Sequence, residues 1–83
     1  MLSEYVDEAL RRARYEMTTD PKDRFVGEVP ELPGVLASGE TLEQCRNELK
    51  DVIEGWILLS VKMSLPIPPL GSESIKELED IPN

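Results

Sequence analysis

The sequence predicts a single α+β domain over residues 1–83, in which one long helix packs against a small antiparallel sheet of three to four strands. Residues 42–63 have the apolar spacing of a helix, whereas the segments around 13–18 and 24–29 alternate as strands do. Proline and glycine separate these elements. A chain of this length buries only about 60–65% of its unfolded surface, so a homodimer or higher homo-oligomer is expected.

An additional N-terminal helix is expected at residues 3–12. Ser3 can serve as its N-cap, acidic side chains occupy the first turn and arginines the last. Tyr5, Val6, Ala9 and Leu10 recur at helical intervals and define an apolar face. The sequence does not indicate what this face contacts.

A three-stranded sheet is expected within residues 13–38. "ARYEMT" and "RFVGEV" both alternate, and the turn-forming "TDPKD" between them favours an antiparallel hairpin. Gly27 in the second strand indicates either a bulge or the close approach of a neighbouring side chain. Pro30 requires that strand to end or to lie at an edge, and Pro33 followed by Gly34 matches a type II turn before the third strand.

The main helix is expected at residues 42–63. Thr41 and Gln44 have the spacing of a capping box. Its second half, "WILLSV", is apolar nearly all round, so either the C-terminal tail or another subunit should cover it. The apolar stripe comprises Leu42, Cys45, Leu49, Val52, Ile53, Trp56, Leu59 and Met63. We assign Trp56, Leu59 and Met63 to the core or to self-association rather than to a ligand pocket.

Residues 66–83 are expected to form a proline-rich connector and a short C-terminal element. "PIPPL" stops the main helix and continues as a rigid extended segment. Residues 72–80 fit either an edge strand or a turn of helix.

The residue types argue against an enzyme. The chain has no histidine, which removes the commonest general base and metal ligand. Cys45 is the only cysteine and lies on the apolar stripe, where a buried, unreactive thiol is expected. No catalytic set, cofactor site or metal site is therefore predicted.

Four glutamates are the candidate partner-binding residues: Glu28, Glu31, Glu40 and Glu43. They cluster in the sequence around the turn and the start of the main helix. Their spacing matches neither a calcium loop nor a two-metal acidic site. We interpret them as an acidic rim, either ordinary solvated charge or a surface for a basic partner.

The formal net charge of −8 narrows the class of partner. An acidic surface repels phosphate, so autonomous nucleic-acid binding is not expected, whereas a basic protein would be attracted. No apolar run approaches the roughly 18 residues of a membrane span, and the first ten residues lack the pattern of a signal peptide. A cytoplasmic protein that does not bind membranes is expected.

The central segment "FVGEVPELPGVLASGETLEQCRNELKDVIEGWILLSVKMSLPIPPL" resembles the HicB antitoxins of toxin-antitoxin pairs. In that family a strand ends in a proline-glycine turn, a Gly-x-Thr sequence begins the helix, an Asn or acid follows within it, and a P-x-P sequence closes it. The matching positions are Pro30 to Gly34, Gly39 to Thr41, Asn47, and Pro66 with Pro68.

The resemblance implies an incomplete ribonuclease-H-like fold, β-β-β-α-β, without catalytic acids. It also implies a partner, a small basic HicA-type toxin that cleaves mRNA and is neutralised when its active site and RNA surface are covered. Many HicB-type proteins repress their own operon through a C-terminal DNA-binding domain. Only about a dozen residues follow "PIPPL" here, so the resemblance does not extend to that function.

Two alternatives to the antitoxin interpretation stay open. One is an orphan homo-oligomeric scaffold or adaptor that has the fold but no toxin partner. The other is an enzyme acting through Cys45 or the glutamates. A gene for a small basic protein beside this one would favour the antitoxin.

Overall fold

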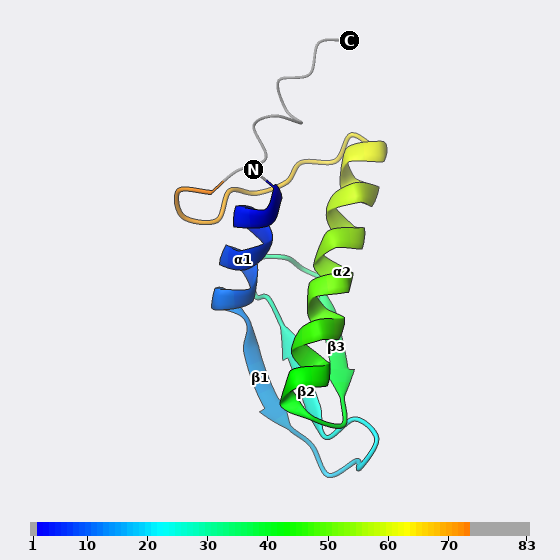
Figure 1. Ribbon diagram of the computed structural model, residues 1–83. Helices are drawn as coiled ribbons and strands as arrows, with labels where there is room; N and C mark the ends of the chain where they lie inside the picture. Colours follow the sequence, from blue (N-terminus) through cyan, green and yellow to red (C-terminus); the bar gives the residue numbers. More distant parts are fainter. Residues whose placement is uncertain (1, 74–83) are drawn as a thin grey trace.

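The computed structural model describes residues 2–73 and has the predicted α+β architecture (Figure 1). The order of elements is α1 (Leu2–Arg12), β1 (Arg14–Met17), β2 (Phe25–Glu28), β3 (Leu36–Gly39) and α2 (Leu42–Lys62). All five expected elements are confirmed to within two residues. Residues 74–80, most of the segment that fitted either strand or helix, lie outside the described residues, as does any fourth strand there.

The three strands form an antiparallel sheet in the order β1-β2-β3. Its register aligns Tyr15, Gly27 and Ala37 across the three strands, on the face that packs against α2. A Cβ atom at Gly27 would lie 2.8 Å from Tyr15 Cε1 and 3.2 Å from Cys45 Sγ. The pairing continues unbroken through Gly27, so the glycine permits a close approach and does not mark a bulge.

The turn between β2 and β3 is of type II, as predicted. Gly34 has φ +88°, and the Val35 N–H donates to the Leu32 carbonyl oxygen at 3.1 Å. Val29, Leu32 and Val35 are buried, so this connection contributes to the core as well as reversing the chain. β2 ends at Glu28, two residues before Pro30.

The first turn of α2 is capped by side chains. Thr41 Oγ1 accepts a hydrogen bond from the Gln44 N–H at 3.1 Å, as a capping box requires. Gln44 Oε1 accepts from the N–H of Glu40 at 3.2 Å, one residue before the cap itself. The helix ends at Lys62, shortly before the proline-rich segment.

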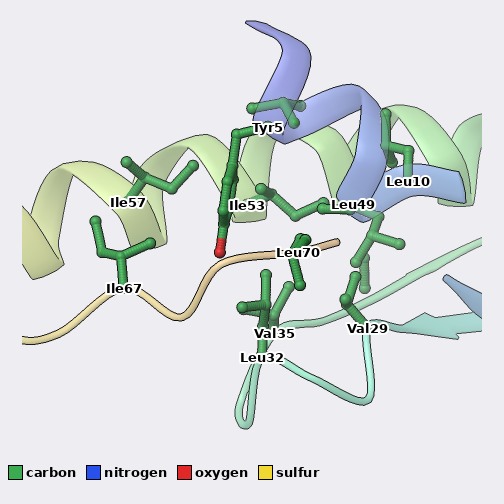
Figure 2. Close-up of a cluster of buried hydrophobic side chains, with 13 residues drawn as sticks. Tyr5, Leu10, Val29, Leu32, Val35, Leu49, Ile53, Ile57, Ile67 and Leu70 are labelled. Atoms are coloured by element: carbon green, nitrogen blue, oxygen red, sulfur yellow. The ribbon is translucent and has the colours of Figure 1, made fainter. Parts of the chain in front are cut away.

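The core lies where α1, the middle of α2, the β2–β3 turn and the connector meet (Figure 2). The Tyr5 ring lies between α2 and the connector, and its hydroxyl donates a hydrogen bond to the Pro68 carbonyl oxygen at 2.5 Å. This gives the apolar face of α1 its partners. The buried core residues are Tyr5, Val6, Ala9, Leu10, Val29, Leu32, Val35, Ala37, Leu49, Ile53, Ile57, Ile67 and Leu70.

Arg12 joins α1 to the β2–β3 turn. Its Nε donates to Glu8 Oε2 and its Nη1 to Glu31 Oε2, both at 2.8 Å. Hydrogen bonds to Glu31 and Glu8 raise the pKa of Arg12. Hydrogen bonds from Arg11 and then Arg12 lower the pKa of Glu8, and the one from Arg12 lowers the pKa of Glu31. The end of α1 is therefore fixed by one guanidinium group with partners on two segments.

Candidate protein-binding surface

The described residues hold no group of three or more His, Cys, Asp or Glu side chains that could bind a metal ion. Cys45 is fully buried, and its Sγ donates to the Ala37 carbonyl oxygen at 3.6 Å. Burial raises the pKa of this thiol, which keeps it protonated and unreactive near neutral pH. Cys45 thus has the environment expected of a structural thiol.

Among residues 2–73, α2 packs on one face of the sheet and no other helix covers the outer face. The strand register places Arg14 and Glu16 of β1 beside Glu28 and Val26 of β2 on this outer face. These four side chains line a shallow hollow of about 110 Å³. Small-molecule sites are typically about 300–1,000 Å³, so the hollow is suited to one side chain of a partner rather than to a substrate.

Glu16 and Glu28 give this hollow an acidic lining. Both glutamates are exposed, whereas Val26 between them is half-buried. A lysine or arginine could rest its aliphatic stem on Val26 and place its charge near the carboxylates. Arg14 lies opposite Glu28 and would partly repel the cationic side chain of the partner. That side chain would therefore be favoured to enter the hollow from the side away from Arg14.

The four glutamates singled out in the sequence do not converge. Glu28 lies opposite Leu36 at one end of the sheet, whereas Glu40 follows Gly39, which pairs with Phe25 at the other end. Glu31 is engaged by Arg12, whose hydrogen bond lowers the pKa of the Glu31 carboxyl and offsets its charge. Glu28 is therefore the one of the four that belongs to the hollow.

Glu40 and Glu43 flank the start of α2, and both are exposed. Acidic groups there interact favourably with the positive end of the helix dipole, which is a structural reason for their position. They form an acidic corner at the end of the sheet opposite to Glu28.

Glu16 is the residue of this surface that the sequence reasoning missed. The alternation of β1 already separated Arg14 and Glu16 from Ala13, Tyr15 and Met17. Applying the antiparallel pairing of β1 with β2 would have set Glu16 opposite Val26 and close to Glu28. The signal was thus the strand register rather than distance along the chain.

The apolar stripe of α2 divides into a buried part and an exposed part. Trp56 is half-buried against the core, but Leu59 and Met63 are 54% and 58% exposed. Of the two roles expected for Leu59 and Met63, the core does not apply, and self-association stays a prediction. Ile57, absent from the predicted stripe, is fully buried instead, and Leu42 is 48% exposed. The exposed set Leu58, Leu59, Val61, Met63 and Leu65 is called the apolar helix end below.

Neither helix between residues 2 and 73 is long and apolar enough to cross a membrane.

Known proteins similar to this chain agree with the architecture. The crystal structure of TTHA0281 from Thermus thermophilus superposes with a TM-score of 0.85 at 38% sequence identity, covering 99% of this chain and 95% of that one. A UPF0150 protein of Synechocystis sp. is 40% identical over 52 residues, 63% of this chain and 71% of that protein. A UPF0150 protein of Thermotoga maritima is 50% identical over 36 residues, 42% of this chain and 48% of that protein. The UPF0150-like family profile matches residues 4–68, and the chain therefore belongs to the UPF0150-like family.

Proposed function

We propose that this protein is an antitoxin-type binder that neutralises a small basic HicA-type ribonuclease by covering its active site and RNA surface. The proposal rests on the HicB-like order of turn, helix start and proline stop in the central segment. Family membership over residues 4–68 supports it at the level of the fold. In this role the protein performs no chemistry of its own, because blocking access to the RNA is sufficient.

The observation that carries the proposal is the hollow lined by Glu16 and Glu28 on the outer face of the sheet. A ribonuclease must present basic side chains to bind RNA, and those side chains are complementary to exposed carboxylates. The hollow between Glu16 and Glu28 can take one cationic side chain, with Val26 as an apolar floor. The formal charge of −8 would speed the encounter and make its rate fall with added salt.

The test uses the purified chain and the product of a small basic gene beside its own. Complex formation is measured by calorimetry and inhibition by an RNA-cleavage assay. We expect Glu16→Lys and Glu28→Lys each to weaken binding at least about tenfold, because each places like charges in contact. Glu48→Lys, the same charge change on an exposed part of α2, should alter binding far less.

One outcome of this experiment would contradict the proposed antitoxin function. A neighbouring product that neither binds the chain nor cleaves RNA would overturn the proposal. The second candidate, an orphan homo-oligomeric scaffold, would then account better for the fold. The exposed apolar helix end favours that candidate, since such surfaces usually mark contacts between proteins.

A further inference from the structure

The second half of α2 and the connector are nearly free of charge. Between residues 55 and 72 the only charged side chain is Lys62, in a chain whose formal charge is −8. Nine large apolar side chains are exposed in the described part of the chain, and five of them form the apolar helix end. Figure 1 shows this part of α2 extending beyond the end of the sheet. Exposed apolar surface of this kind marks an interface.

Gly55 provides a second, independent observation. Glycine is unfavourable in the interior of a helix, so its presence there calls for a reason. A Cβ atom at Gly55 would have no atom within 4 Å, so nothing in the described part of the chain requires glycine at this position. The missing side chain at Gly55 leaves a notch on the helix surface. Leu58 and Leu59 follow Gly55 at three and four residues and therefore border this notch.

From these observations we propose that the apolar helix end binds a second copy of this chain, as an antiparallel pair of α2 helices that cross at Leu58. The exposed leucines of one copy fill the notch at Gly55 of the other. Such a two-fold contact requires a surface that is complementary to itself.

The charges beside Leu58 meet this requirement. Glu54 lies four residues before Leu58 and Lys62 four residues after it, so the three share one face of the helix. In an antiparallel pair that crosses at Leu58, Lys62 of each copy lies beside Glu54 of the other. The contact therefore contains two ion pairs of opposite charge and places no like charges together.

Charge also favours a second copy over a different partner. Two copies that carry −8 each repel through most of their surfaces, and the apolar helix end is the extended region where they can approach. A basic partner would find few carboxylates there, because it is drawn to the acidic parts of the surface. The inference does not depend on the proposed toxin, since the chain alone is tested.

The experiment measures the mass of the purified full chain by sedimentation equilibrium over a range of concentrations. We expect a dimer, which Leu58→Glu converts to a monomer by placing two carboxylates at the crossing point. Leu36→Glu changes a similarly exposed leucine on the outer face of the sheet and should leave the dimer intact. A wild-type monomer at about millimolar concentration, or a dimer that survives Leu58→Glu, would overturn the proposal.

Three further variants identify the geometry of the dimer. Lys62→Glu should weaken the dimer at least about tenfold through repulsion of Glu54 in the other copy, and adding Glu54→Lys should restore it. Gly55→Ala should raise the melting temperature of the dissociated chain while weakening the dimer, because the methyl group favours the helix but fills the notch. Failure of the double exchange to restore the dimer contradicts the antiparallel crossing.

Discussion

The hydroxyl of Tyr5 donates a hydrogen bond to the carbonyl oxygen of Pro68, and so joins two residues that lie 63 positions apart in the sequence. Tyr5 belongs to α1 and Pro68 to the connector that follows α2. The ring itself is fully buried among core residues of both segments. This hydrogen bond therefore links α1 to the proline-rich connector.

Replacing Tyr5 by phenylalanine tests the energetic value of this contact. Tyr5→Phe keeps the ring but removes the donor to Pro68, and should lower the free energy of unfolding by about 1 kcal/mol. The free energy of unfolding is measured by urea denaturation, with tryptophan fluorescence as the signal. Tyr15→Phe is the matched control, because the Tyr15 hydroxyl is buried without a hydrogen-bond partner in the described part of the chain. The stability of Tyr15→Phe should be unchanged or higher by up to about 1 kcal/mol. An equal loss of stability in both variants would show that the hydrogen bond of Tyr5 is not the cause.

Gly39 should be intolerant of a side chain. A Cβ atom there would lie 2.6 Å from Cys45 N and 3.0 Å from Cys45 Cα, and backbone atoms cannot move aside as a side chain can. Gly39→Ala should lower the free energy of unfolding, measured by thermal denaturation, by about 2 kcal/mol. Gly27→Ala meets side-chain atoms of Tyr15 and Cys45 and should cost less. The reverse order would show that the approach of β3 to α2 is not tight.

Cys45 should react slowly with alkylating reagents in the native state. Its thiol is fully buried, and burial raises its pKa, so both access and thiolate formation are suppressed. Mass spectrometry should detect rapid labelling only in denaturant. Fast modification of the folded protein would instead revive an enzymatic role for this residue.

The ion pair between Arg12 and Glu31 should make a small, pH-dependent contribution to stability. The hydrogen bond from Arg12 lowers the pKa of Glu31 below its ordinary 4.5 in the folded protein. A lowered pKa means that the contribution is present above about pH 4.5 and is lost as the pH falls through the folded value.

The melting temperatures of the wild type and Glu31→Gln should therefore differ at about pH 7 and converge as the pH falls through the lowered pKa of Glu31. Glu31 is exposed and Arg12 is only half-buried, so added salt should also reduce the difference. Glu48→Gln removes the same charge from α2 without touching Arg12. A pH-dependent difference of equal size in that control would mean that net charge, not the ion pair, is responsible.

The elements were predictable from the sequence because their signals are local. Thr41 caps α2 and Pro66 prevents its continuation, so both ends of the longest helix can be found from neighbouring residues alone. The type II turn at Pro33 and Gly34 follows from two residues whose backbone preferences match its geometry.

The predicted stripe is buried at Cys45, Leu49 and Ile53, but burial in the last turns of α2 was not predictable in the same way. Trp56, Leu59 and Met63 recur at helical spacing with the buried residues, but spacing does not tell which part of a broad apolar surface is covered. Coverage depends on where α1 and the connector lie, and no local signal encodes that position. The same holds for Glu16 and Glu28, whose proximity arises from pairing between strands.

The core contact between α1 and the connector has a consequence for the order in which the chain folds during synthesis. The apolar face of α1 leaves the ribosome well before Ile67 and Leu70, which complete its surroundings. The hairpin and α2 rely on contacts closer in sequence and can form earlier. Helix α1 therefore docks completely only after the chain has been made as far as Leu70.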